Sequence, residues 1–274
     1  MYLYADVLSM LGLPAPVARC AEGSIRPPLP ELESPAAWYV FPPVLIPMWS
    51  DGSSPSYIGY WKHWFLDREP SFVRMYVEGH SPVEEIARTP EQLFCAVAMT
   101  AISSVDGIDE DLRAFANAVG IDNLAELDRV SGQTGDDPKG FVEIAQFATN
   151  TPLESTTSLG AYTGTFPTGE FLASRPWWNN SCSFEMPEDG LSKWPDAISR
   201  PPWLDTGSDK GQLFEAYLRD GDLRSAWLTL NSTGWSLAGA KLALGALRDA
   251  AGDGAFSTLV AAWLSIADES AGGY

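Results

Sequence analysis

Short runs of apolar and aromatic residues, separated by turn-forming residues, characterise the first part of the chain. Residues 44–49 are almost entirely apolar, residues 50–54 read Ser-Asp-Gly-Ser-Ser, and aromatic residues return at 57–61. A polar turn between two β-prone runs is typical of paired strands. Residues 71–77 alternate two sets of large side chains and also favour a strand. We therefore predict strands at 44–49, 57–61 and 71–77, with further buried strand material at 38–41.

A helical pattern replaces this alternation at residue 89. Thr89 is placed to cap a helix, Pro90 suits the first helical position, and Gln92 follows three residues after the cap. Leu93 and Val97 then fall on one helical face. Further helices are predicted from spacing and end signals at residues 2–13, 109–118, 122–131 and 138–148.

The pattern changes again near residues 149 and 208. Residues 151–207 are rich in Thr, Ser, Gly, Pro and Trp without helical periodicity, whereas residues 208–274 show apolar residues at helical spacing. We predict an α+β fold, with a mixed or antiparallel sheet flanked by helices and an additional C-terminal region of three short helices. The predicted organisation is a core domain at 1–150, an irregular segment at 151–207 whose rings pack on the core, and a helical region at 208–274.

The charge of the chain is strongly negative. It contains 17 Lys and Arg against 36 Asp and Glu, a formal net charge of −19. Nucleic acids and anionic membrane surfaces select clustered positive charge, so neither is an expected partner. The excess of carboxylates keeps the protein soluble, and it also attracts basic proteins over long range. The N-terminus lacks the basic start of a signal peptide and no apolar run reaches ~18 residues, so we predict a cytoplasmic protein without a membrane span.

The cysteines and acidic residues lack the spacing of metal ligands. Cys20, Cys95 and Cys182 are far apart and form no CxxC pair, which favours reduced, buried thiols. The acidic residues at 106–111 depart from a calcium-binding loop in the position of the glycine and of the last ligand, and helix-start acids explain them. We therefore predict that no metal or organic cofactor is required.

Signatures of catalysis are missing from the sequence. It contains no phosphate-binding loop, no GxGxxG, no HExxH and no GxSxG. His63 and His80 are the two histidines; His63 is predicted to be a partly exposed residue at a strand end, and His80 to lie in a turn. The acidic pairs at 84–85 and 136–137 are interpreted as solvated turn charges. We predict that the protein is not an enzyme.

Aromatic residues around the first turn are the candidate partner-binding site. Large, semi-rigid rings beside a polar group are typical of interface anchors. The candidates are Trp49, Asp51, Tyr57, Tyr60 and Trp61. Strand alternation places Tyr57 and Trp61 on the face opposite Tyr60, and one face must line the core, so only some of these rings are expected to reach a partner. The alternative is that all of them are core or turn-packing residues.

The order of these elements resembles the SUKH superfamily of bacterial toxin-immunity proteins. The resemblance covers roughly residues 30–120, and it rests on a strand that ends in an Asp-Gly turn at 45–52, Tyr-Ile-Gly at 57–59, the strand at 71–77 and the Pro-Glu-Gln-Leu helix start at 90–93. It implies a non-catalytic protein that binds and neutralises a cognate protein toxin. An acidic inhibitor would attract a basic toxin.

Two other functions are compatible with the sequence. The first is a scaffold or regulatory module of the same fold that binds a protein without inhibiting it. The second is a hydrolase with an acidic site that follows no recognised motif. Scarcity of histidine and lack of a nucleophile motif weigh against the hydrolase.

Overall fold

Six strands form one antiparallel sheet, in which each strand pairs with the next along the chain. The strands are β1 (Leu32–Glu33), β2 (Leu45–Asp51), β3 (Ser56–Trp61), β4 (Ser71–Tyr76), β5 (Pro82–Ala87) and β6 (Ser181–Ser183). The computed structural model describes residues 3–35, 41–53, 55–77, 82–166, 181–183, 201–205, 207–267 and 272–274.

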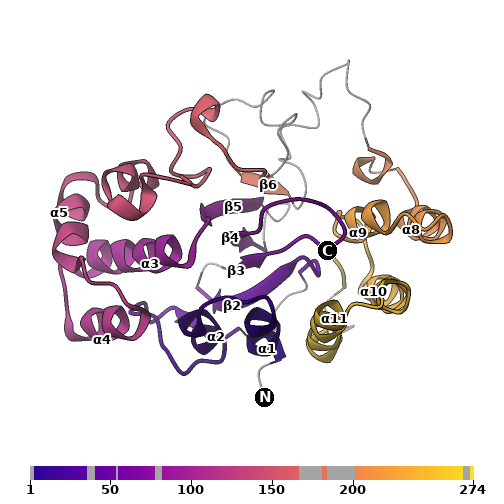
Figure 1. Cartoon of the computed structure of the whole chain (residues 1–274), viewed down its shortest axis with the longest axis horizontal. Helices are drawn as coiled ribbons and strands as arrows, with labels where there is room; N and C mark the ends of the chain where they lie inside the picture. Colours follow the sequence, from indigo (N-terminus) through magenta and orange to yellow (C-terminus); the bar gives the residue numbers. More distant parts are fainter. Residues whose placement is uncertain are drawn as a thin grey trace.

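Two groups of helices enclose the sheet. Figure 1 shows α3, α4 and α5 on one side of it, α8 to α11 on the other, and α1 and α2 beside β2. The α-helices are α1 (Leu3–Met10), α2 (Ala15–Ala21), α3 (Pro90–Val105), α4 (Glu110–Val119), α5 (Leu124–Thr134), α8 (Lys210–Arg219), α9 (Leu223–Leu230), α10 (Leu237–Ala251) and α11 (Gly254–Ile266). Short 3₁₀ helices are η1 (Pro138–Glu143), η2 (Ala145–Phe147), η3 (Leu159–Ala161) and η4 (Pro202–Leu204).

The helices on both sides explain the composition of the central strands. Every residue of β3 is buried, and so is every residue of β2 except Asp51 at its end. A strand covered on both faces reads as a continuous apolar run, because neither set of alternating side chains meets water. The aromatic sequences of β2 and β3 are therefore a consequence of this enclosure.

A glycine is required where β3 passes β2. Gly59 pairs with Pro47, next to an irregularity in the register between Pro47 and Trp49. A Cβ at Gly59 would lie 2.5 Å from the carbonyl oxygen of Ile46 and 2.9 Å from Cα of Pro47. Proline cannot donate a ladder hydrogen bond, so a bulge lets β2 carry Pro47 inside the sheet, and the close backbone approach leaves room only for glycine.

The start of α3 ties the helix to the segment that follows α5. Thr89 caps the helix by accepting from the backbone N–H of Gln92, as its sequence predicts. Gln92 is fully buried, and its Nε2 lies 3.0–3.1 Å from the carbonyl oxygens of Gln146, Thr149 and Asn150. In a capping box, the side chain of Gln92 would accept from the backbone N–H of Thr89. Here Gln92 Oε1 accepts from the N–H of Arg88 instead, so the capping box is not formed.

Buried polar contacts join the C-terminal helices to the sheet. Asn231, at the end of α9, accepts through Oδ1 from the N–H of Val44 at 2.8 Å and donates through Nδ2 to the carbonyl of Trp227. Trp263 of α11 donates to the carbonyl of Phe41 at 3.0 Å. Helix α1 packs directly on α11. These contacts connect residues of 208–274 with the start of β2 without passing through the 151–207 segment.

The α+β prediction is confirmed, and the sheet is antiparallel throughout the described strands. The strands predicted at 44–49, 57–61 and 71–77 correspond to β2, β3 and β4. Residues 36–40, which include most of the predicted strand material at 38–41, and the rings at 176–180 lie outside the described residues. The predicted division into segments at 150 and 207 stays a prediction.

Three details differ from the sequence-based expectation. The helix predicted at 138–148 consists of η1 and η2, because Phe141, Ile144 and Phe147 recur every three residues, the period of a 3₁₀ helix. The C-terminal region shows four helices in its described part instead of three. Strand β5 was not predicted, because its two adjacent glutamates resemble a turn.

Within the described ranges, no helix has both the length and the apolar character that crossing a membrane requires.

Candidate functional site

The four candidate rings are core residues. Trp49, Tyr57 and Trp61 are each 1 % exposed, and Tyr60 is 8 % exposed. The expectation that some of them reach the surface is wrong, because helices or loops cover both faces of β3. Tyr57 packs on Phe41 with ring centroids 4.8 Å apart. The rings therefore lack the exposed area that an interface anchor needs.

Asp51 is the one predicted site residue with appreciable exposure, and it forms the turn after β2. Its Oδ1 accepts from the backbone N–H of Ser53 at 2.9 Å and from Ser53 Oγ at 2.8 Å. An aspartate that bonds two residues ahead mimics a backbone turn. The Asp-Gly sequence is thus explained by the turn itself.

The aromatic residues after β3 pack against the C-terminal helices. Phe65 meets Trp227 of α9 at 6.2 Å and Phe256 of α11 at 5.1 Å between ring centroids. Trp64 also contacts Phe256, at 5.3 Å. Phe65 has a φ of 65°, a left-handed conformation that is strained for a bulky side chain. The ring contacts hold Phe65 in this conformation. Trp64 and Phe65 therefore connect the end of β3 to the C-terminal helices.

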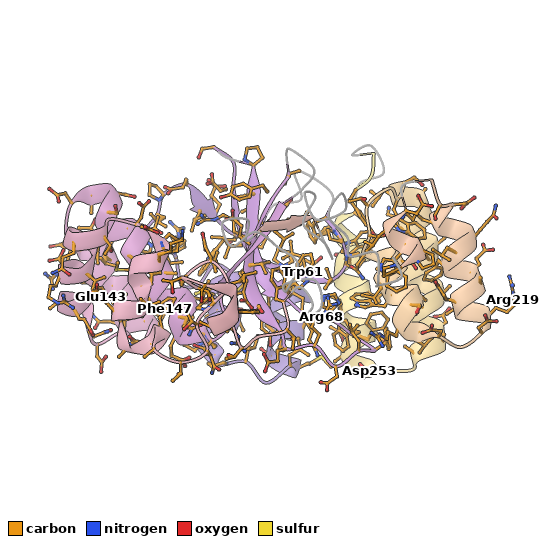
Figure 2. All side chains as sticks on the ribbon, turned by 90° about the horizontal axis from the view of Figure 1, so that it is seen from above. Trp61, Arg68, Glu143, Phe147, Arg219 and Asp253 are labelled. Carbon is orange, nitrogen blue, oxygen red and sulfur yellow. The ribbon has the colours of Figure 1, made fainter. Side chains whose placement is uncertain are left out.

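His63 is buried at 1 % exposure, which contradicts the predicted strand-end exposure. Trp61 Nε1 donates to His63 Nε2 at 3.1 Å, and Arg68 Nη1 lies 3.1 Å from the same nitrogen. Nε2 therefore acts as the acceptor for the indole N–H of Trp61. Figure 2 shows Trp61 and Arg68 in the middle of the molecule, beside the C-terminal helices. His80 lies outside the described residues.

The interpretation of Glu84 and Glu85 as solvated turn charges is wrong. Both lie in β5, and Glu85 is 1 % exposed. Its carboxyl group accepts from Ser71 Oγ at 2.5 Å, from the N–H of Leu153 at 2.7 Å and from the hydroxyl of Tyr162. Burial nevertheless raises the pKa of Glu85 to about 7, because loss of hydration outweighs these bonds. Glu85 is therefore a buried anchor for residues 153–162.

A second carboxyl with a raised pKa lies at a cavity. Glu154 lines a space of about 350 Å³ together with Arg74, Asp136 and Asp137, and mostly apolar residues of β1, β3, β5, α3 and η1, with Leu29, form the remaining wall. Burial, followed by repulsion from Glu84, raises the pKa of Glu154 to about 7. Asp136 and Asp137 are exposed, as predicted. The cavity therefore combines an apolar wall with excess negative charge.

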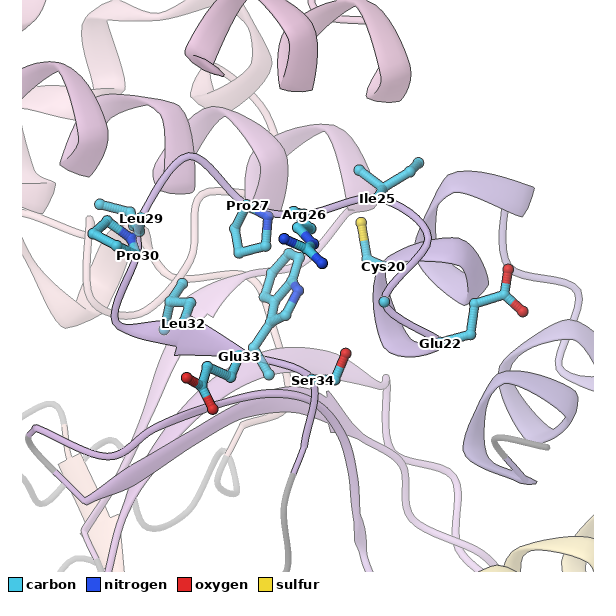
Figure 3. Close-up of a pocket in the computed structure, with 12 residues that line it drawn as sticks. Cys20, Glu22, Ile25, Arg26, Pro27, Leu29, Pro30, Leu32, Glu33 and Ser34 are labelled. Carbon is cyan, nitrogen blue, oxygen red and sulfur yellow. The ribbon is translucent and has the colours of Figure 1, made fainter.

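Residues 22–34, called the strap here, follow α2 and include β1, and they border a larger cavity. Its volume is about 550 Å³, and Trp49 of β2 lines it opposite the strap. Figure 3 shows the strap arching from α2 to β1, with Arg26 and Pro27 turned toward the space beneath it. Ile25, Leu29 and Leu32 are buried apolar residues of the strap. The sequence suggested only a proline-rich connector here, because the cavity depends on a strand that lies further along the chain.

A groove lies on the other side of the strap, against α4. It has a volume of about 610 Å³ and is lined by Ile25, Arg26, three strap prolines, Phe115 and the carboxylates Asp109 and Asp111. Val105, at the end of α3, also lines the groove and is 54 % exposed. The strap therefore separates two hollows, and Arg26 borders both.

The exposed surface of α4, α5 and η1, called the acidic face here, carries much of the charge. Residues 106–143 contain ten Asp and Glu against three Lys and Arg, and nine of the ten acids are exposed. The exposed acids are Asp106, Asp109, Glu110, Asp111, Asp122, Asp128, Asp136, Asp137 and Glu143. Residues 210–266, which span α8 to α11, contain five of each sign. Glu143 and Arg219 lie toward opposite ends of the molecule in Figure 2.

Cys20 and Cys95 lack the features of reactive thiols, and the described residues show no cluster of metal ligands. Cys20 and Cys95 are free and buried, and burial raises the pKa of each thiol to about 12. Such thiols are poor nucleophiles at neutral pH. Asp109 caps α4 by accepting from the N–H of Leu112, which accounts for one acid of the 106–111 stretch. Across the described ranges, no three His, Cys, Asp or Glu side chains converge as metal ligands would.

Comparison with known proteins gives no relative: no protein-family model, no curated protein and no solved structure matches this chain.

Proposed function

We propose that this protein is a non-catalytic binding protein that neutralises a basic protein toxin through its acidic face. The observation that carries the proposal is the uneven distribution of charge, with an excess of seven carboxylates over residues 106–143 and none over residues 210–266. A surface of one sign raises the association rate of an oppositely charged partner and disfavours partners of the same sign. The resemblance to toxin-immunity proteins supports the same function.

Apolar surface within and beside the acidic face supports a protein partner over a small cation. Val105 is 54 % and Val142 39 % exposed, and both lie among carboxylates. The groove between the strap and α4 adds prolines and Ile25 to this surface. Protein interfaces combine apolar contact with a polar rim, whereas a small cation would need only the charges.

The test compares two variants that each lose three charges. Asp111→Asn, Asp128→Asn and Asp136→Asn are combined in one variant, and Glu215→Gln, Asp220→Asn and Asp249→Asn in its control; all six side chains are exposed. None of the six caps a helix through its side chain. The two variants therefore differ in the location of the lost charge and should both stay folded.

The partner is first captured from source cells with the wild-type protein, and its toxicity is measured on expression alone and with each variant. We expect the captured partner to be a basic protein. Its association should slow about tenfold with the acidic-face variant and also with added salt. The control variant should protect cells from its toxicity as well as the wild type does. A captured partner that is acidic, harmless alone, or equally affected by both variants would overturn the proposal.

Hydrolysis at an acidic site is a second candidate function, favoured by one observation. Glu154 lines a cavity and has a pKa raised by burial to about 7, a value suited to general acid–base catalysis near neutral pH. Nitrophenyl esters, phosphates and glycosides are the substrates to test. Turnover that disappears in Glu154→Gln would favour the hydrolase over the binding protein.

A further inference from the structure

The indole N–H of Trp49 is a buried donor without an acceptor. Trp49 is 1 % exposed, and its Nε1 has no hydrogen-bond partner among the described residues. Trp61 and Trp263, also in the core, donate to His63 and to the carbonyl of Phe41, whereas Trp64 and Trp227 lack an acceptor among the residues described, as Trp49 does. Of these three unpaired indoles, Trp49 is the one that lines a cavity described above. Buried donors are nearly always paired, so an unpaired one beside a cavity indicates that something else supplies the acceptor.

The cavity beneath the strap can accommodate that acceptor. Its volume of about 550 Å³ exceeds what a single water needs and falls within the range of small ligand sites. Cys20, Ile25, Leu29 and Leu32 give it a buried apolar wall. The occupant that fits is an apolar group of several carbons attached to a carbonyl oxygen.

The rim of the cavity is acidic. Glu22 and Glu33 line it and are exposed, and Arg26 supplies the opposite charge, which leaves an excess of one carboxylate. Figure 3 shows Glu22 and Glu33 at the two ends of the strap. Basic groups that flank the apolar group would therefore be favoured at both ends. A peptide segment combines all three features: an apolar side chain, a backbone carbonyl and neighbouring Lys or Arg.

We propose that the cavity beneath the strap receives an apolar side chain from a basic peptide segment of the partner, whose backbone carbonyl accepts from Trp49 Nε1. This inference rests on the proposed function, because the strap borders both this cavity and the groove against the acidic helix α4. The acidic face would attract the partner, and the cavity would anchor one short segment of it.

The indole signals of the ¹⁵N-labelled full-length protein provide a direct test. The chain has 11 tryptophans, and Trp49→Phe identifies the signal of residue 49. The probes are three capped tripeptides: acetyl-Lys-Leu-Lys-amide, acetyl-Lys-Gly-Lys-amide and acetyl-Glu-Leu-Glu-amide. We expect saturable movement of the Trp49 signal with the first peptide, with a Kd on the order of 1 mM, and at least fivefold weaker binding of the other two.

A double variant tests the rim. Glu22→Gln with Glu33→Gln should weaken the leucine-containing basic peptide about fivefold, whereas Glu215→Gln with Asp220→Asn, which removes two exposed charges elsewhere, should leave binding unchanged. Glu22 accepts from Ser24 Oγ, and glutamine keeps an acceptor there. A Trp49 signal that stays fixed up to about 10 mM, as it would with water alone in the cavity, overturns the inference, and so does equal binding of all three peptides.

The outcomes also separate this inference from the proposed function. A partner that depends on the acidic face while the peptide fails to move the Trp49 signal would refute the cavity site alone. Peptide binding at Trp49, together with a partner that ignores the acidic-face charges, would refute the proposed function alone.

Discussion

Among the described residues, the two sides of the sheet are built from different kinds of contact. On the C-terminal side, Trp64, Phe65, Trp227 and Phe256 interlock, and Asn231 closes a buried hydrogen bond to β2. On the strap side, three cavities of about 350, 550 and 610 Å³ are lined by strap residues. The difference teaches that the richest aromatic sequence lies in the interior of this molecule, whereas a proline-rich connector borders the described cavities.

The largest expected effect tests the packing on the C-terminal side of the sheet. Trp227→Ala removes a fully buried ring that contacts Phe65 and Phe256, so the free energy of unfolding should fall by about 3–5 kcal/mol. Urea unfolding followed by circular dichroism measures it. Leu242→Ala, at a residue 78 % exposed, is the control and should change stability by less than about 0.5 kcal/mol. A loss below about 1 kcal/mol for Trp227→Ala would mean that this side is loosely packed after all.

The next effect is a dependence of the free energy of unfolding on pH, caused by Glu85. Its folded pKa of about 7 lies above the usual 4.5, so its contribution to stability is fully present below pH 4.5 and is lost as pH rises through 7. A shift of this size corresponds to about 3 kcal/mol. The free energy of unfolding should therefore fall between these two pH values, and the fall should be smaller by that amount in Glu85→Gln.

Glutamine is a suitable replacement, because it can accept from the N–H of Leu153 while it donates to Ser71. Glu154→Gln is a parallel measurement, since burial raises the pKa of Glu154 to about 7 as well. Identical pH profiles for wild type and Glu85→Gln would show that the carboxyl of Glu85 stays hydrated in solution.

A smaller effect is expected at the hydrogen bond between the C-terminal helices and β2. Asn231→Ala leaves the N–H of Val44 buried without its acceptor, which should cost about 2 kcal/mol. Thermal and urea unfolding should show one transition at lower stability. Two separate transitions would instead indicate that residues 208–274 unfold independently, as a separate domain would.

The smallest effect compares two buried indole N–H groups, one unpaired and one paired. Trp49→Phe removes an unpaired donor, whereas Trp61→Phe removes one that donates to His63 at 3.1 Å. Both changes lose the same volume, so Trp61→Phe should be the more destabilising by about 1 kcal/mol. Equal losses would indicate that Trp49 finds an acceptor in the free protein.

Local patterns predicted the central elements of the fold well. Alternation and turn residues located β2, β3 and β4, and the Thr-Pro start located α3, because these signals lie within a few residues of one another. The same signals misplaced Glu85, whose burial depends on donors at residues 71, 153 and 162. No local pattern reports such distant partners.

The candidate site was harder to predict than the fold. An aromatic ring in a strand can face a core or a partner, and only the position of the covering helices decides between them; here they cover both faces. The strap cavity requires residues 20–34 and Trp49 to meet with imperfect packing, which depends on three-dimensional arrangement alone. Its one sequence signal was the cluster of prolines, which fix φ and so limit how the backbone adjusts.

The hydrogen bonds of Gln92 have a consequence for the local unfolding of the protein. Its two amide hydrogens are shared among three carbonyl oxygens of residues 146–150, more than fifty positions along the chain. That segment cannot separate from the first turn of α3 without exposing several polar groups at once, so the two should exchange their amide hydrogens as one cooperative unit. Hydrogen-exchange rates at the start of α3 and across η2 should therefore rise together in Gln92→Ala, while those of α10 stay unchanged.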